Sequence, residues 1–175
     1  MSFCEDMMKE LSVNGNNTAR SVLSLLSEAR LCFATAESCT GGLIGQMITA
    51  LPGSSEIYAG GVISYSNDVK MKVLSVRKET LERFGAVSEE TAGEMSEGVS
   101  KLTDADIAVS VTGIAGPTGA VPGKPVGTVC FGLTTKKDTK TYRKQFGENK
   151  TRDEIRALAA DFALSLVLEA GKELS

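Results

Sequence analysis

The amino-acid sequence predicts an α/β protein, a three-layer α/β/α sandwich around a mixed, mostly parallel sheet of about five strands. Apolar runs typical of buried strands alternate with segments of helical periodicity through most of the 175 residues. The polar turn Lys136-Lys137-Asp138 separates two strand-like runs, which predicts an antiparallel hairpin at one side of the sheet. With 42% hydrophobic residues, a chain of this length can bury a core without disulfides.

The first half of the chain contains two expected strands and the helices between them. Residues 1–16 show little periodicity and are expected to form a loose lead-in to one domain over residues 17–175. A helix capped by Asn16 or Asn17 should pack through an apolar face. Its members are Ala19, Val22, Leu23, Leu26 and Ala29. We then expect a strand over 31–36, a helix ended by Pro52, a strand over 60–65 and a short helix capped by Asn67.

The second half continues the alternation and adds the hairpin. A helical piece over 77–84 precedes a helix over 89–102, capped by Ser88 and buried through Ala92, Met95, Val99 and Leu102. A buried strand over 106–112 follows, and then a loop over 113–125 with four glycines and three prolines. The hairpin strands should cover 126–134 and 139–146, and the last helix 152–174 should begin with a capping box formed by Thr151 and Glu154.

Charge and hydropathy argue against two classes of partner, nucleic acids and membranes. The net charge of -3 shows no basic surplus, which argues against a nucleic-acid binder that relies on phosphate contacts. No apolar run approaches the roughly 18 residues that a membrane-spanning helix needs. The polar, acidic N-terminal segment is unlike a signal sequence, so we expect a cytoplasmic protein with no membrane partner.

The numbers and positions of the cysteines, and the lack of histidine, limit the catalytic and metal-binding mechanisms that the chain can use. The four cysteines have no C-x-x-C spacing, and Cys32 and Cys130 lie in strand-like runs, so we interpret them as reduced packing residues. The chain has no histidine, which rules out Ser-His-Asp and Cys-His catalysis within one subunit. A zinc site would need carboxylates or thiolates alone, and we expect neither a metal nor a cofactor. Proton transfer must use Lys, Tyr, Asp or Glu.

The segment Thr35–Gly42 joins the first expected strand to a helix. Such a turn directs backbone N–H groups and the positive end of the helix dipole outward, an arrangement suited to an anion or a developing oxyanion. Ser38, Cys39 and Thr40 lie in it, followed by Gly41 and Gly42. The alternative interpretation is an ordinary helix cap with glycines for close packing.

Candidate residues for chemistry follow three expected strands at one sheet edge, where ligands of α/β folds gather. They are Ser38, then Tyr65 with Lys70, then Thr112. A desolvated lysine can act as base and a tyrosine can relay the proton or orient the lysine, which together suggest acyl transfer from a serine. The N–H groups of Cys39, Thr40 or Gly41 would form the oxyanion hole. As structural alternatives, the serine is a cap, the tyrosine a rim aromatic and the lysine a solvated side chain.

Three further residues have two interpretations each. Cys39 is a rival nucleophile, but a thiolate usually relies on a histidine, so we prefer Ser38. Glu37 is either a second base that meets the substrate or the centre of a hydrogen-bond network behind the turn. Arg152 opposes the dipole in the first turn of the last helix. It either pairs with Asp153 or Glu154, or it binds a phosphate or carboxylate at the mouth of the site.

The glycine-rich loop is a further candidate for substrate binding. No G-K-[ST] follows Gly113 and Gly116, so the loop is not a Walker motif, and the chain has no dinucleotide-binding G-x-G-x-x-G. Lys124 could still reach a phosphate from this loop. We therefore assign the loop, together with Thr112 and Arg152, to substrate binding.

Several separated motifs resemble the CinA carboxy-terminal domain family in order and spacing, from about residue 17 to the end. These are Thr35–Gly42, Gly61–Asn67 with Lys70, Gly85–Ser88, Thr112–Pro117 and Lys124–Gly127. Members of the family are nicotinamide-nucleotide amidases, which hydrolyse nicotinamide mononucleotide to nicotinic acid mononucleotide and ammonia in pyridine nucleotide recycling. The resemblance implies a serine nucleophile with a lysine and a tyrosine, which match Ser38, Lys70 and Tyr65.

The final family motif matches with a departure. The pattern R-x-x-[IV]-R fits Arg152, Ile155 and Arg156, but the family usually has F-x-G-D-R before the isoleucine or valine. Here Phe146–Arg152 has two extra residues and no Gly-Asp pair, so we expect a different local loop and altered phosphate affinity. Longer CinA proteins carry an amino-terminal molybdopterin-binding-like domain, and we expect the stand-alone form without its pyrophosphatase activity.

Three functions are compatible with these residues. The leading one is a metal-independent amidase acting on nicotinamide mononucleotide. The others are a nucleotide-binding regulatory module without turnover, and a Ser-Lys amidase for another small phosphorylated amide. Small enzymes of this kind are often symmetric dimers, so a homo-oligomer is expected.

Overall fold

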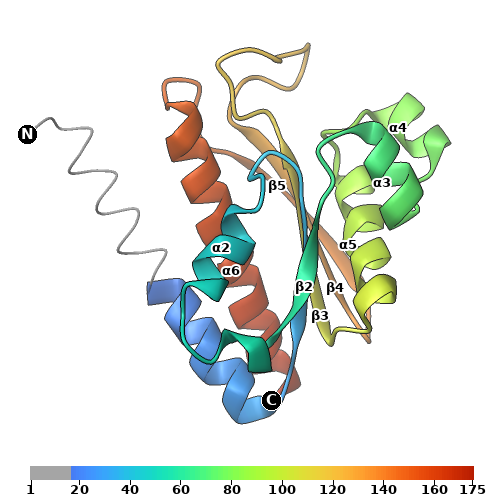
Figure 1. Cartoon of the computed structure of the whole chain (residues 1–175). Helices are drawn as coiled ribbons and strands as arrows, with labels where there is room; N and C mark the ends of the chain where they lie inside the picture. Colours follow the sequence, from blue (N-terminus) through green and yellow to red (C-terminus); the bar gives the residue numbers. More distant parts are fainter. Residues whose placement is uncertain (1–16) are drawn as a thin grey trace, which may run out of the picture.

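A five-stranded mixed sheet forms the middle layer of the computed structural model, which describes residues 17–175 (Figure 1). The strand order is β2-β1-β3-β4-β5, and the strands are β1 (Phe33–Glu37), β2 (Tyr58–Ile63), β3 (Ile107–Gly113), β4 (Thr128–Thr135) and β5 (Thr139–Gln145). β1 pairs in parallel with β2 and β3, whereas the β3–β4 and β4–β5 pairs are antiparallel. The predicted fold class and its hairpin are confirmed. The expected lead-in over residues 1–16 lies outside the described residues.

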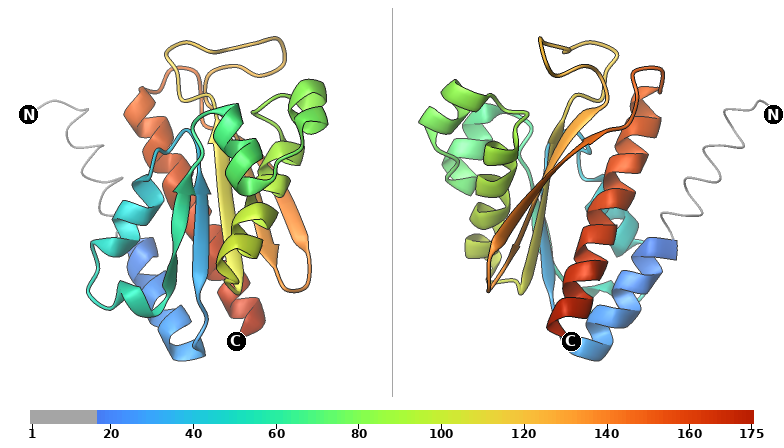
Figure 2. Two further views of the ribbon diagram at one scale, coloured as in Figure 1. Left: turned by 45° about the vertical axis from the view of Figure 1, so that its right-hand side comes forward. Right: turned by 180° about the vertical axis from the view of Figure 1, so that it is seen from behind.

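Helices cover both faces of the sheet (Figure 2). One face carries the helix over residues 17–29, α2 (Leu43–Thr49) and α6 (Arg152–Leu174). The other carries α3 (Asn67–Leu74), α4 (Lys78–Phe84) and α5 (Glu89–Thr103), and a short 3-10 turn, Ser54–Glu56, leads into β2. Among the described residues, no helix combines the length and apolar character needed to cross a membrane.

The alternation of side chains along β1 divides the buried residues between two cores. Phe33 contributes to the larger core, which lies under α6, while Ala34 and Ala36 contribute to the smaller core under α5. Small residues on that second face let α5 approach closely. A Cβ atom at Gly132 would overlap the backbone of Ala92, and one at Gly98 would overlap the backbone of Leu74.

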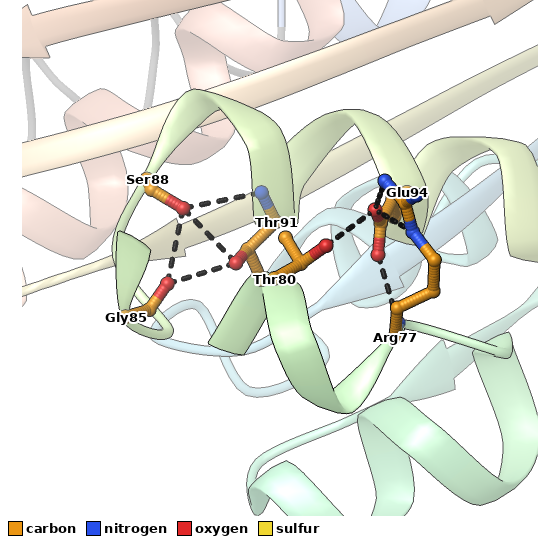
Figure 3. Close-up of polar contacts among 6 residues, drawn as sticks. All are labelled: Arg77, Thr80, Gly85, Ser88, Thr91 and Glu94. Atoms are coloured by element: carbon orange, nitrogen blue, oxygen red, sulfur yellow. Dashed lines mark hydrogen bonds and ion pairs between the residues drawn. The ribbon is translucent and has the colours of Figure 1, made fainter. Parts of the chain in front are cut away.

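A polar cluster fastens α4 to α5 (Figure 3). The Glu94 carboxylate accepts from the backbone N–H of Arg77 at 2.8 Å and from Thr80 Oγ1 at 2.7 Å, and it also pairs with the Arg77 guanidinium. At the other end, Ser88 Oγ and Thr91 Oγ1 donate to the carbonyl of Gly85 at 3.0 and 2.8 Å. These contacts hold the short segment between the two helices.

Two details of the helices differ from the prediction. Ser66, not Asn67, caps α3, because Ser66 has the extended backbone of an N-cap and its hydroxyl accepts from the N–H of Val69 at 3.3 Å. Leu102 was expected on the buried face of α5 but is 58% exposed. It lies in the last turn of the helix, beyond Val99, the last of the buried residues of α5. The predicted capping box of α6 is confirmed.

Candidate active site

The turn between β1 and α2 is built around the carboxylate of Glu37. Its oxygens accept hydrogen bonds from the N–H groups of Gly42, Ile44 and Gly45 at 2.9, 3.2 and 3.0 Å. Gly42 is the N-cap of α2 and has no side chain to serve this purpose, so Glu37 satisfies the first turn of the helix in its place. Of its two interpretations, the structure favours the network behind the turn.

Glycines and a strand contact give the turn its shape. The N–H of Ser38 donates to the carbonyl of Val111 on β3 at 2.9 Å, which extends the sheet by one residue. Gly41 and Gly42 then have φ angles of 62° and 96°, in the left-handed region that other residues avoid. The chain therefore reverses directly after Ser38 and leaves its side chain at the end of the strand.

Lys70 reaches Ser38 from α3. Its Nζ lies 3.1 Å from Ser38 Oγ and donates to the carbonyl of Ser64 at 2.7 Å. The lysine is only 1% exposed. Burial disfavours the ammonium form and lowers the pKa of Lys70 from its ordinary value, which increases the fraction of neutral amine. The hydroxyl of Ser38 and the amine of Lys70, whose pKa is lowered, are therefore in contact.

Backbone donors are available beside the serine. Across residues 17–175, the N–H groups of Cys39 and Thr40 donate to no other residue's backbone or side-chain oxygen. The N–H groups of Ser38, Gly41 and Gly42 are already used within the fold. The predicted oxyanion donors of Cys39 and Thr40 thus have no acceptor in another residue of the described range, whereas Gly41 donates to the carbonyl of Ser38 at 3.1 Å.

Cys39 lines the same site but has the chemistry of a packing residue. It is 6% exposed. Burial raises the pKa of the Cys39 thiol to about 12, so the thiolate is scarce at neutral pH. This supports the preference for Ser38 over Cys39 as the nucleophile.

Tyr65 stands at the mouth of the site and contacts Arg152. The Tyr65 side chain is 64% exposed, and its hydroxyl oxygen accepts from Arg152 Nη2 at 3.0 Å. It makes no hydrogen bond to Ser38 or Lys70 in this structure, so the predicted grouping of all three side chains is present as a Ser38–Lys70 pair with the tyrosine beside it.

Arg152 has no carboxylate partner among the described residues. Asp153 pairs with Arg156 at 3.2 Å, and Glu154 is occupied by the capping box with Thr151. Arg152 instead donates from Nη1 to the carbonyl of Gly116 at 2.7 Å, in addition to its contact with Tyr65. The positive charge of Arg152 is therefore not neutralised by either neighbouring carboxylate, and it lines the site although the segment Phe146–Arg152 departs from the family pattern.

A cavity of about 230 Å³ opens over the Ser38–Lys70 pair. The predicted residues Thr112, Gly113 and Gly116 line it together with Tyr65 and Arg152. Lys124 does not line it, because its Nζ donates to the carbonyl of Phe84 at 2.6 Å and holds the glycine-rich loop against α4. Glu37, Thr40, Gly41 and Gly42 are not among its lining residues.

Comparison with known proteins places the chain in a family. Residues 15–170 match the CinA C-terminal domain. The chain belongs to the CinA C-terminal domain family. A CinA-like protein of Kosmotoga olearia is 50% identical over 149 residues, which are 85% of this chain and 36% of that protein. A CinA-like protein of Thermotoga maritima is 52% identical over 117 residues, 67% of this chain and 29% of that protein. The chain thus spans about a third of these CinA-like relatives.

Solved structures of CinA proteins have the same fold. The competence/damage inducible protein CihA from Agrobacterium tumefaciens superposes with a TM-score of 0.87 at 38% identity, over 91% of this chain and 96% of that one. A CinA superfamily protein from Klebsiella pneumoniae gives 0.86 at 34% identity, over 91% and 98%. The predicted family resemblance is confirmed.

Two groups at this CinA-type site were not assigned a role from the sequence. The carbonyl of Ser64 binds Lys70, and Arg156 Nη2 donates to the carbonyl of Thr40 at 2.9 Å, which connects α6 to the turn. Ser64 lies within the motif Gly61–Asn67, and Arg156 ends the R-x-x-[IV]-R pattern, so membership of these motifs was the signal that could have pointed to them.

Proposed function

We propose that this CinA-family chain is an amidase that hydrolyses the carboxamide of nicotinamide mononucleotide to nicotinic acid mononucleotide and ammonia. The observation that carries the proposal is the 3.1 Å contact between Ser38 Oγ and Lys70 Nζ at the end of two parallel strands. Both residues are at most 9% exposed, so the pair is shielded from bulk water. A serine next to a desolvated amine is an arrangement suited to acyl transfer without histidine.

The charges of the cavity favour a small anionic substrate. Within the described range 17–175, the charged residues that line it are Lys70 and Arg152, and no carboxylate does. Since Arg152 has no acidic partner, a phosphate can take up its remaining N–H donors without displacing an ion pair. A phosphorylated amide bound this way would keep its phosphate at the mouth and its carboxamide next to Ser38.

The proposed reaction starts with proton transfer from Ser38 Oγ to neutral Lys70. Oγ then bonds to the carboxamide carbon, and the resulting oxyanion accepts a hydrogen bond from the N–H of Cys39, which belongs to a cavity-lining residue. The C–N bond breaks as the nitrogen receives the proton from Lys70, and ammonia leaves an ester on Ser38. Water, deprotonated by the same lysine, attacks the ester and releases the carboxylate and the serine.

Tyr65 is assigned a supporting role at the leaving nitrogen. Because Arg152 donates to its hydroxyl oxygen, the hydroxyl hydrogen of Tyr65 remains available to another acceptor. Tyr65 lines the cavity together with Ser38 and Lys70, so we propose that it hydrogen-bonds the leaving amino group of a bound substrate.

Ammonia release from nicotinamide mononucleotide tests the function directly. The wild-type chain should release ammonia and the matching carboxylate in equal amounts, and Ser38→Ala should reduce the rate to background. A chelator should leave the rate unchanged. Full activity of Ser38→Ala would contradict the mechanism. Turnover only of other phosphorylated amides would identify a different substrate, and tight nucleotide binding in calorimetry without product would indicate the regulatory module.

A further inference from the structure

Ser64 is buried beside the proposed catalytic pair, and one of its polar atoms is unused. The residue directly follows β2 and is fully buried. Its N–H donates to the carbonyl of Glu37 at 2.8 Å, and its carbonyl accepts from Lys70 Nζ at 2.7 Å. The hydroxyl, in contrast, has no hydrogen-bond partner.

An unpaired hydroxyl at this position is an unfavourable feature of the resting protein. Leaving a buried polar group unsatisfied costs on the order of 1–3 kcal/mol, and an alanine of nearly the same size would avoid the cost. Within residues 17–175, the buried side-chain oxygens without a partner belong to Thr40, Ser64 and Asp161. Of these three residues, Ser64 is the one whose backbone carbonyl accepts a hydrogen bond from Lys70. The backbone carbonyl of Thr40 accepts from Arg156 instead.

The hydrogen-bonding needs of Lys70 change during the proposed reaction. A neutral amine has two N–H donors and a lone pair, and the resting Nζ contacts two oxygens, Ser38 Oγ and Ser64 O. When Lys70 takes the proton of Ser38 it becomes an ammonium with three donors. At the same moment Ser38 Oγ becomes bonded to the acyl carbon and is a poorer acceptor. The ammonium then lacks acceptors in a buried site.

We propose that the Ser64 hydroxyl is the acceptor that the Lys70 ammonium gains when Ser38 gives up its proton. The carbonyl that already binds Nζ and the free Oγ belong to one residue, so rotation about a single side-chain bond moves Oγ relative to Nζ. The contact forms with the charged state and stabilises it over the resting state. Ser64 is therefore a positioning residue that acts through Lys70, and this role rests on the proposed amidase function.

Other charges around Lys70 remain the same when the hydroxyl is removed. On α3 itself, Asp68 and Lys72 form an exposed ion pair. Glu37 is held behind the turn and Cys39 is a neutral thiol, while Arg152 lies across the cavity. The acidic residues of α5, which packs against α3, are Glu89, Glu90, Glu94 and Glu97, with Glu94 paired to Arg77. If the pKa of Lys70 changes when Ser64 is replaced by alanine, the change can therefore be attributed to the loss of the Ser64 hydroxyl.

The experiment measures the titration of Lys70 by NMR of ¹³C-labelled lysine, assigned with Lys70→Arg, together with the pH profile of ammonia release. Ser64→Ala should shift the titration of Lys70 to lower pH, since its ammonium loses an acceptor. The same variant should lower kcat roughly tenfold with KM unchanged, and it should move the rising limb of the profile to lower pH. Ser64→Thr, which keeps the hydroxyl, should retain the wild-type titration.

Ser96→Ala is the matched control, because Ser96 is also a fully buried serine but its hydroxyl is paired with that of Thr134 on β4. Ser96→Ala should change neither the titration of Lys70 nor the rising limb of the pH profile of ammonia release. An unchanged titration of Lys70 in Ser64→Ala would overturn the proposal. A wild-type chain that releases no ammonia would contradict the proposed amidase function. The NMR titration requires no turnover, so it would still show whether the Ser64 hydroxyl accepts a hydrogen bond from the Lys70 ammonium.

Discussion

Lys70 acquires its proposed role through burial. A solvated lysine is an ammonium at neutral pH and cannot accept a proton. Here α3 carries the side chain under the cavity, where it is 1% exposed and bonded to Ser38 and Ser64. Since water no longer stabilises the charge, the pKa of Lys70 is lowered, and the same burial that costs stability makes the amine available as a base.

The pH dependence of activity follows from this shift. Only neutral Lys70 can deprotonate Ser38, so kcat/KM should rise with pH and level off above the pKa of Lys70, which lies below the ordinary lysine value. Lys70→Met should lower kcat at least about 100-fold. Lys72→Met, on the exposed side of the same helix, should keep the wild-type profile. A rising limb at the ordinary lysine value, or an active Lys70→Met, would contradict this assignment.

At the scale of secondary-structure elements, the close packing of α5 against the sheet and against α3 positions Lys70. α5 packs on both the sheet and α3, and α3 carries Lys70. Gly98 allows the contact with α3, because any side chain there would overlap the backbone of Leu74 at the end of that helix. The placement of Lys70 thus depends on a glycine in a different helix.

Gly98→Ala should therefore destabilise the protein by about 2–3 kcal/mol, measured by urea unfolding, because the overlap is with backbone that cannot rotate away. Gly93→Ala is the control in the same helix. Its Cβ would lie 3.2 Å from the methyl group of Thr141, and the gain in helix propensity of up to about 1 kcal/mol offsets that contact. Equal losses of stability in the two variants would show that the close packing at Gly98 is not responsible.

Local patterns predicted the elements well, and contacts between distant segments less well. The strands were predicted to within a few residues because apolar runs mark β1 and β3, and the capping box of α6 is a local motif. Ser66 and Asn67 are adjacent cap-forming residues, so propensity could not choose between them. The Tyr65–Arg152 bond joins residues 87 positions apart, and no local pattern reports such a contact.

The whole molecule brings the proposed site together from four separate segments. The parallel strands β1, β2 and β3 end at one edge, which gathers the turn at Ser38, the segment at Tyr65 and the loop after Thr112. Arg152 arrives from α6 and joins two of these segments through Gly116 and Tyr65. A ligand in the cavity would contact all of them, so binding should stabilise the entire fold.

Nicotinamide mononucleotide at about 100 times its Kd should raise the Tm of Ser38→Ala, which cannot turn it over, by roughly 5–10 °C. Adding Arg152→Ala should remove most of this increase, since the phosphate loses its cation. Arg143→Ala is the control, because Arg143 holds the same glycine-rich loop through Gly123 but does not line the cavity. An undiminished increase without Arg152 would place the phosphate elsewhere.

The most direct test of the central claim is mass spectrometry of the protein quenched in acid during turnover of nicotinamide mononucleotide. Ser38 as the nucleophile predicts an ester of nicotinic acid mononucleotide on the peptide that contains Ser38, localised to that residue by fragmentation and absent from Lys70→Met. An acyl adduct on Cys39 would contradict the assignment of Ser38 as the nucleophile. So would ammonia release during which no acylated protein is detected.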